Sequence, residues 1–175
     1  MVKPHVTHNT GNNEWYTPKE YISAAILTMG QIDLDPASTL EANEVVQART
    51  IYTVQDNGLE QKWVGRIWLN PPYARKLIEP FCNKLLVSLR SKDVTEAIVL
   101  VNNATETKWF QALAKESRVI MFPFRRIKFW CPDKGIGSPL QGQAIFYFGS
   151  NCNQFIEAYK DFGLICTPKK GLGYV

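Results

Sequence analysis

The polar and apolar positions along the chain predict strands and helices in alternation. Short apolar or alternating runs indicate strands, and apolar side chains at a spacing of about 3.6 residues indicate helices. The expected strands are 31–35, 51–54, 66–69, 97–101, 119–124, 143–148 and 164–166, and the expected helices are 17–29, 40–48, 81–89, 105–117 and 151–162. Because strands and helices alternate, we predict an α/β fold on a single, mainly parallel sheet.

The clearest signal for the start of a helix lies at residues 17–20. Thr17 is expected at the N-cap, Pro18 at the first helical position, and Glu20 completes a capping box. Gly30 is the expected terminator of this helix. A further proline, Pro80, interrupts the apolar pattern of the third predicted helix, which we therefore expect from residue 81 onward.

The length and composition fit one domain. A chain of 175 residues with 45% hydrophobic residues can bury roughly 70% of the surface that its unfolded form exposes. The first residues are polar, so we expect a flexible N-terminal arm at 1–12 and a single domain at 13–175. The longest apolar run, 119–124, is far shorter than the ~20 residues of a membrane span, and no signal peptide is visible. The four cysteines form no CxxC pair and have no histidine at zinc-finger spacing. We therefore expect a cytoplasmic protein with reduced thiols and no metal site.

Positive charge is concentrated in one segment. The formal net charge is +4, and the stretch from Arg118 to Lys134 holds five basic residues and one acidic residue. Such a local cluster suits contacts with phosphate groups. The alternative is a solvated surface hairpin, in which Phe124 and Phe129 are expected to be core residues.

Two polar side chains fall at the ends of predicted strands. Asp35 ends the first strand and Asn70 directly follows the third, so both are expected at the sheet edge where α/β proteins bind ligands. Pro71 and Pro72 fix the backbone after Asn70, and the Pro71 carbonyl is left free to accept a hydrogen bond. With the Asn70 carboxamide oxygen, it would hold both hydrogens of an amino group, and Tyr73 offers a face on which a planar ring stacks. The alternative is a plain strand-to-loop stop with a packed tyrosine.

The Asn70–Tyr73 tetrapeptide resembles the Asp/Asn/Ser-Pro-Pro-aromatic motif of S-adenosylmethionine-dependent amino-methyltransferases. Further segments accompany it in order. These are Trp15-Tyr16-Thr17-Pro18, Asp33-Leu34-Asp35-Pro36-Ala37-Ser38, Asp56-Asn57-Gly58-Leu59, Trp63-Val64-Gly65, Thr107-Lys108-Trp109-Phe110 and Arg126-Ile127-Lys128-Phe129. Together they resemble the phage-encoded DNA adenine methyltransferase family (Dam type), over roughly residues 13–149.

The resemblance implies a Rossmann-like methyltransferase domain with S-adenosylmethionine as its cofactor. Asn70, Pro71, Pro72 and Tyr73 match the catalytic motif, and Tyr73 would stack on an adenine flipped out of duplex DNA. The implied cofactor-binding residues are Trp15, Tyr16, Thr17, Pro18, Asp35, Pro36, Ala37, Ser38 and Asp56. Ala37 and Ser38 depart from the glycine-rich form of the cofactor loop, and Asp56 has an alternative role as a turn residue.

DNA is the implied partner. The expected nucleic-acid contacts are Arg75, Lys76, Arg125, Arg126, Lys128 and Lys134. About 30 residues separate the cofactor loop from the tetrapeptide Asn70–Tyr73, which we call the clamp. This is too few for a separate target-recognition domain. Two alternatives stay open at this point. One is a methyltransferase for another amino group, a protein glutamine amide or cytosine N4. The other is an inactive nucleic-acid-binding relative.

Overall fold

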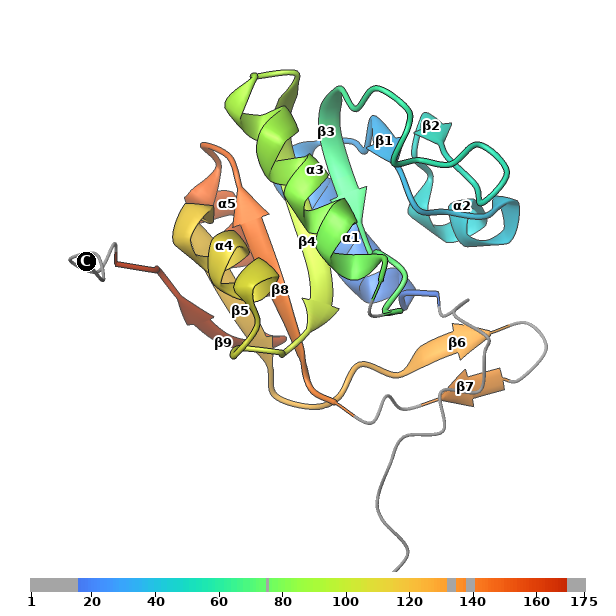
Figure 1. Cartoon of the computed structure of the whole chain (residues 1–175). Helices are drawn as coiled ribbons and strands as arrows, with labels where there is room; N and C mark the ends of the chain where they lie inside the picture. The colour runs from blue at the N-terminus through green and yellow to red at the C-terminus, as the bar shows by residue number, and fades with distance from the viewer. Residues whose placement is uncertain (1–15, 75, 132–134, 138–140, 170–175) are drawn as a thin grey trace, which may run out of the picture.

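The computed structural model describes residues 16–74, 76–131, 135–137 and 141–169. The expected arm at 1–12 lies outside the described residues, as do residues 13–15 of the expected domain. Seven strands form one sheet in the order β2-β1-β3-β4-β8-β5-β9, and β6 and β7 form a separate two-stranded sheet (Figure 1).

Apart from the two short strands within residues 129–137, which were not among the expected strands, the elements follow the predicted alternation, with ends shifted by a few residues. The strands are β1 (Leu34–Asp35), β2 (Thr50–Ile51), β3 (Gly65–Leu69), β4 (Val94–Asn102), β5 (Val119–Pro123), β6 (Phe129–Cys131), β7 (Gly135–Gly137), β8 (Gln143–Phe148) and β9 (Gly163–Cys166). The helices are α1 (Lys19–Met29), α2 (Leu40–Val46), α3 (Ile78–Arg90), α4 (Lys108–Glu116) and α5 (Cys152–Tyr159).

The predicted α/β class is confirmed, but the sheet is mixed. Strands β2, β1, β3 and β4 pair in parallel, whereas β8 runs antiparallel to both β4 and β5, and β9 runs antiparallel to β5. The expectation of a mainly parallel sheet is therefore not confirmed. The chain leaves β5 and returns into β8 at the same edge of the sheet, so β8 has to run against its two neighbours.

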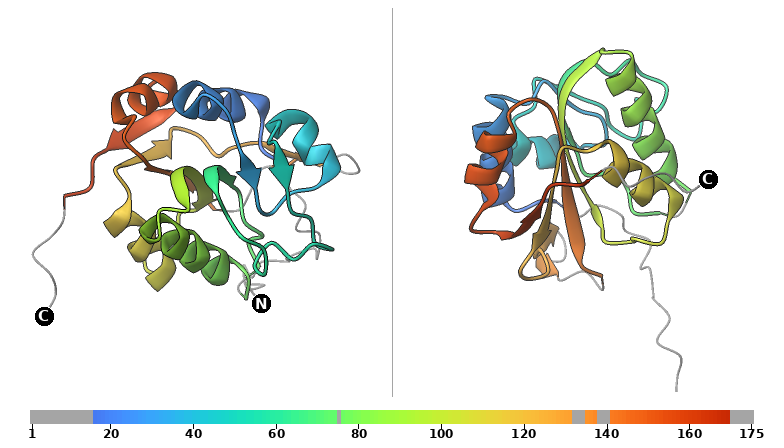
Figure 2. Two further views of the ribbon diagram at one scale, coloured as in Figure 1. Left: turned by 90° about the horizontal axis from the view of Figure 1, so that it is seen from above. Right: turned by 90° about the vertical axis from the view of Figure 1, so that its left-hand side faces the viewer.

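Helices cover both faces of the sheet (Figure 2). Helices α3 and α4 pack on one face, where Phe81, Leu85 and Leu113 are buried in one core cluster. Helices α1, α2 and α5 pack on the other face, where Ile22 and Phe155 are buried in a second cluster. Among the described residues, no helix is long and apolar enough to cross a membrane.

The order of strands reverses direction beside β1. From β1 the chain moves outward to β2, and it then crosses to the other side of β1 to form β3. In open α/β sheets, the crevice beyond the carboxyl ends of the strands at such a reversal is where ligands bind. Asp35 ends β1 and Asn70 follows β3, so the fold places both at this crevice, as the sequence predicts.

Two predicted helix starts were wrong in detail. Helix α1 begins at Lys19 with Pro18 at the N-cap and without a side-chain capping hydrogen bond, so Thr17 does not cap it. The Thr17 hydroxyl instead contacts Asn70, and this tertiary contact replaces the local one. Pro80 lies inside the first turn of α3, where the backbone N–H has no partner within the helix, so the proline does not break it. Gly30 ends α1 with a positive φ of 82°, as predicted.

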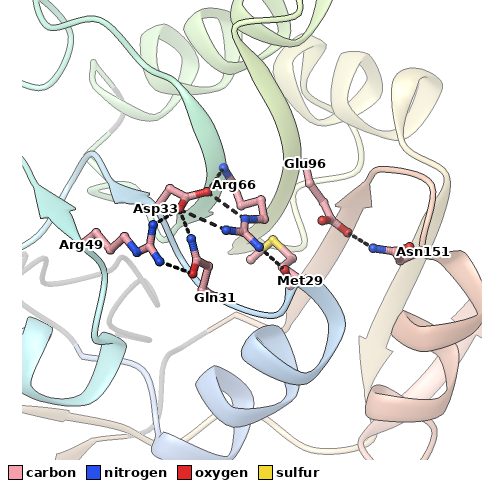
Figure 3. A network of polar contacts seen from close by, with 7 residues as sticks. All are labelled: Met29, Gln31, Asp33, Arg49, Arg66, Glu96 and Asn151. Carbon is pink, nitrogen blue, oxygen red and sulfur yellow. Dashed lines mark hydrogen bonds and ion pairs between the residues drawn. The ribbon is translucent and has the colours of Figure 1, made fainter.

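A polar network holds together the opposite, amino edge of the sheet (Figure 3). The backbone N–H and the Nε of Arg66 donate to Asp33 Oδ2 at 2.9 and 2.8 Å, and Arg66 Nη1 donates to the Met29 carbonyl at 3.0 Å. The hydrogen bond from the Arg66 side chain lowers the pKa of the Asp33 carboxyl to about 2. This network joins β1, β3 and the end of α1, and it fixes the strands whose other ends form the crevice.

Candidate active site

A cavity of about 400 Å³ lies at the carboxyl ends of β1 and β3. Ten of the residues predicted for the site line it, and these are Tyr16, Thr17, Asp35, Pro36, Ala37, Ser38, Asn70, Pro71, Pro72 and Tyr73. Pro18 and Asp56 do not line it, and Trp15 lies outside the described residues. The fold therefore brings together three segments that are far apart in the sequence.

The Asn70 carboxamide contacts a hydroxyl group at each of its two ends. Its Nδ2 lies 3.4 Å from Thr17 Oγ1, and its Oδ1 accepts a hydrogen bond from the Tyr73 hydroxyl at 2.8 Å. The Tyr73 ring packs edge-on against Phe129, with centroids 6.3 Å apart, and burial raises the pKa of Tyr73 far above its ordinary value. Tyr73 is therefore a neutral hydrogen-bond donor that lies between Asn70 and Phe129 of strand β6.

Asp35 places a carboxylate inside a mostly apolar cavity. Its side chain is 4% exposed, and its Oδ1 accepts a hydrogen bond from the Ala37 N–H at 3.2 Å. Burial raises the pKa of the Asp35 carboxyl to about 6, although hydrogen bonds from Ala37 and Ser38 act in the opposite direction. A buried carboxylate with so little compensation marks a candidate ligand contact, and a cationic group is what it would attract.

The loop after β1 is held from the side by the segment 52–58. Ser38 N–H donates to the Tyr52 carbonyl at 2.9 Å, and Tyr52 N–H donates to the Asp35 carbonyl at 3.0 Å. Gly58 packs so closely on this loop that an added Cβ would lie 2.0 Å from the Pro36 carbonyl oxygen. These contacts could not be predicted from the sequence, because a glycine after an asparagine indicates only a turn. The contact with Pro36 depends on tertiary packing.

Asp56 occupies the turn position that was the alternative for it. Its Oδ2 accepts hydrogen bonds from the backbone N–H and the hydroxyl of Thr53, at 2.8 and 2.7 Å, and the side chain is exposed. These two bonds lower the pKa of the Asp56 carboxyl. The geometry therefore favours a turn residue, and it gives no support to a cofactor contact.

Strand β6 packs against two residues that line the cavity, Tyr16 and Tyr73. Tyr16 and Trp130 exchange backbone hydrogen bonds of 2.9 and 3.1 Å, and their rings meet edge to face with centroids 4.9 Å apart. The Tyr16 hydroxyl accepts a hydrogen bond from Thr39 Oγ1 at 3.0 Å, at the start of α2. Neighbouring residues of β6 thus contact both the wall formed by Tyr16 and, through Phe129, the clamp at Tyr73.

The basic segment runs from β5 to β6 along the carboxyl edge of the sheet (Figure 1). The backbone N–H of Ile127 donates to the buried Gln143 side chain at 3.1 Å, and Gln143 pairs with Asn102 at the end of β4, which anchors the segment there. The exposed cationic side chains of this segment are Arg125, Arg126 and Lys128. Lys76, which follows the clamp, is also exposed. Arg75 and Lys134 lie outside the described residues.

The two phenylalanines of this segment differ in burial. Phe129 is buried, as expected of a core residue, but Phe124 is 72% exposed, so the prediction for Phe124 was wrong. Strand β5 ends at Pro123, and the backbone N–H of Phe124 bonds to the Phe162 carbonyl at 3.0 Å, which turns its side chain away from the core.

Among the described residues, no cluster of three or more His, Cys, Asp or Glu side chains could hold a metal ion.

Comparison with known families gives one match. The model of the family described as DNA N-6-adenine-methyltransferase (Dam) matches residues 5–147, which is most of the chain and includes every segment that lines the cavity. No curated protein matches the sequence.

Proposed function

Because the chain belongs to the DNA N-6-adenine-methyltransferase (Dam) family, we propose that it transfers a methyl group from S-adenosylmethionine to the N6 amino group of an adenine flipped out of duplex DNA. Family membership makes the chain an enzyme that methylates adenine in DNA. The observation that supports the finer proposal is that one cavity is shared by both groups of predicted residues. The cavity is lined both by the segments assigned to the cofactor and by the Asn70–Tyr73 clamp.

The residues of the cavity fit S-adenosylmethionine. The cavity has a volume of about 400 Å³, which is within the range of small-molecule sites, and the lining of the cavity is mainly apolar with a few polar groups. The buried Asp35 carboxylate suits a ligand that carries positive charge, and Tyr16 and Thr17 lie on the adjacent wall. When bound, the cofactor supplies an electrophilic methyl group on a sulfonium centre.

The clamp acts on the amino group of the target. Adenine N6 is a poor nucleophile because its lone pair is delocalised into the ring. The Asn70 carboxamide oxygen and the Pro71 carbonyl accept its two hydrogens, which localises the lone pair and orients it for attack. Asn70 is not a strong base, so the proton of the methylated nitrogen leaves to solvent. The Tyr73 ring supports the face of the extracted base.

Exposed positive charge supports the assignment of a DNA-facing surface. Arg125, Arg126 and Lys128 lie on the segment that ends at Phe129, and Phe129 contacts the clamp tyrosine. Contacts with phosphates at these side chains would place the duplex over the mouth of the cavity. Base-edge contacts that choose the methylated sequence would then come from short loops around this mouth.

Transfer of labelled methyl from S-adenosylmethionine to unmethylated duplex DNA, followed by nucleoside analysis, tests the proposal. We expect labelled N6-methyladenine from the wild type and none from Asn70→Ala. Asn153→Ala removes an exposed carboxamide on α5 and should retain full activity. Label on cytosine N4 or on protein glutamine would show that the substrate is that amino group and not adenine N6. Cofactor binding without any transfer would indicate an inactive relative.

The salt dependence of DNA binding tests the basic segment separately. Removal of one side chain that neutralises a phosphate makes the slope of log K against log salt shallower by about 0.9. We expect this change for Arg125→Ala and for Lys128→Ala. Lys115→Ala, an exposed lysine in the last turn of α4, should leave the slope unchanged. Equal slopes in the wild type and all three variants would place the DNA on another surface.

A further inference from the structure

The carboxamide of Asn70 has a required orientation. For the proposed reaction the Asn70 oxygen has to face the amino group of the target. The NH₂ group of Asn70 could not bond there, because it is a hydrogen-bond donor like the amino group of adenine. The oxygen and nitrogen ends of a carboxamide are nearly equal in size, so packing does not choose between them. Only hydrogen-bond partners distinguish the two ends, and a half-turn of the side chain would abolish the acceptor.

The two hydroxyl groups at Asn70 differ in chemistry. A phenol is a strong donor and a weak acceptor, because its oxygen lone pair is delocalised into the ring. An aliphatic hydroxyl oxygen is the better acceptor. The structure places the phenol of Tyr73 at Oδ1, 2.8 Å away, and the aliphatic hydroxyl of Thr17 at Nδ2, 3.4 Å away. Each end of the carboxamide therefore meets the hydroxyl that suits it.

Both partners are themselves fixed in place. The Thr17 side chain is 4% exposed and lies directly before α1, next to the Tyr16 backbone that pairs with β6. The Tyr73 ring packs on Phe129 of the same strand. A carbonyl oxygen has two lone pairs, so the Asn70 oxygen can accept a hydrogen bond from the target in addition to the one from Tyr73.

From these contacts we propose that Thr17 is a positioning residue. Its hydroxyl, together with that of Tyr73, holds the Asn70 carboxamide with the oxygen toward the amino group of the target base. This inference rests on the proposed function. It assigns to Thr17 a role toward the target base, whereas the family resemblance assigns it to the cofactor.

The test measures recognition of the amino group by binding alone. Two duplexes carry a site mapped from the wild-type reaction, one with the target adenine and one with purine, which lacks the 6-amino group. In both, the target base lies opposite an abasic position, so that the cost of flipping does not depend on base pairing. We expect the wild type, loaded with S-adenosylhomocysteine, to bind the adenine duplex about tenfold more tightly, as for one buried hydrogen-bonded contact. Thr17→Val should lower this ratio clearly, because only the contact with the Pro71 carbonyl remains, whereas Thr17→Ser should retain it and Tyr73→Phe should lower it.

A matched control separates positioning from general destabilisation. Thr28→Val deletes another buried threonine hydroxyl of the α1 region, which donates to the Ala24 carbonyl at 2.8 Å, and should keep the wild-type ratio. Calorimetric binding of S-adenosylhomocysteine should be the same in Thr17→Val as in the wild type.

The possible outcomes distinguish this inference from the proposed function. An unchanged ratio in Thr17→Val overturns the positioning role. A loss of S-adenosylhomocysteine affinity in Thr17→Val with an intact ratio also overturns it, and makes Thr17 a cofactor contact. A wild type that binds no S-adenosylhomocysteine, or that does not prefer the adenine duplex, contradicts the proposed function itself.

Discussion

The Asp35→Asn variant is expected to be more stable than the wild type at neutral pH. Burial raises the pKa of the Asp35 carboxyl from 3.8 to about 6. A pKa change of this size corresponds to about 3 kcal/mol. Once Asp35 is ionised, the free energy of unfolding is lower by this amount than it would be without the pKa change. Asparagine carries no charge, and its side-chain oxygen can still accept from the Ala37 N–H.

The pH window of this effect follows from the direction of the pKa change. Between about pH 4 and pH 6 the unfolded chain gives up the Asp35 proton while the folded chain retains it, so the stability of the wild type falls as the pH rises through this range. Above the window the penalty is complete, and below it the penalty is absent. For a chain of this length the gain at pH 7.5 corresponds to a rise in Tm of about 6–12 °C.

Thermal unfolding of both proteins from pH 4 to pH 8, without cofactor, measures the effect. The difference in Tm should be largest above pH 7 and should vanish near pH 4. Asp56→Asn is the control, because hydrogen bonds from Thr53 lower the pKa of Asp56 and the expected change has the opposite sign. A difference between Asp35→Asn and the wild type that does not vary with pH would refute the reasoning.

The same variant should lose affinity for S-adenosylmethionine. A charged group that destabilises the folded protein is retained where activity requires it, and this trade-off is common at active sites. Calorimetric titration should show weaker binding by Asp35→Asn, and weaker binding by the wild type as the pH falls below about 6. A variant that is more stable and binds equally well would remove Asp35 from the proposed site.

Three further variants test the surroundings of the cavity. Gly58→Ala should lower both Tm and cofactor affinity, because its Cβ would lie 2.0 Å from the Pro36 carbonyl oxygen; calorimetry that shows normal affinity would contradict this. Asp33→Asn should cost about 1–3 kcal/mol in denaturant unfolding at pH 7, as expected for hydrogen bonds to a charged group. In the wild type, the pKa of the Asp33 carboxyl is lowered to about 2, so the stabilisation by the ionised carboxylate disappears as the pH falls from about 4 to 2. A lower stability of the variant that persists at pH 2 would refute the assignment of the effect to the charge of Asp33. Trp130→Ala should weaken cofactor binding with only a small loss of Tm, because it removes the ring that supports the cavity wall; unchanged affinity would separate β6 from the site.

The placement of Asp35 and Asn70 at the edge of the sheet could be predicted from the sequence because it depends on local order along the chain. Asp35 ends a run of alternating apolar and polar residues, and Asn70 follows an apolar run. Polar residues after parallel strands meet at one edge whatever the details of packing. The direction of β8 could not be predicted in this way. Strands β4 and β8 are both buried on both faces, and a continuous apolar run has the same pattern in either direction.

Tertiary contacts override local signals at two further positions. The segment from Thr17 to Glu20 satisfies the local rules for a capping box, yet the Thr17 hydroxyl contacts a residue 53 positions away. Phe124 continues the apolar run of β5 in the sequence, but the strand ends one residue earlier and exposes it. In both cases the residue lies at the carboxyl edge of the sheet, where contacts from distant segments decide its conformation.

Strand β6 connects the exposed basic side chains with the walls of the cavity. Successive side chains of a strand point to opposite sides, and here Phe129 meets the clamp at Tyr73 while Trp130 meets the wall at Tyr16. Lys128, directly before them, is exposed. A phosphate held at Lys128 is therefore one residue away from a side chain that packs on the clamp, and two residues away from one that packs on the cofactor wall. Under the proposed function, the surface that holds the DNA and the walls of the cavity form one continuous structure.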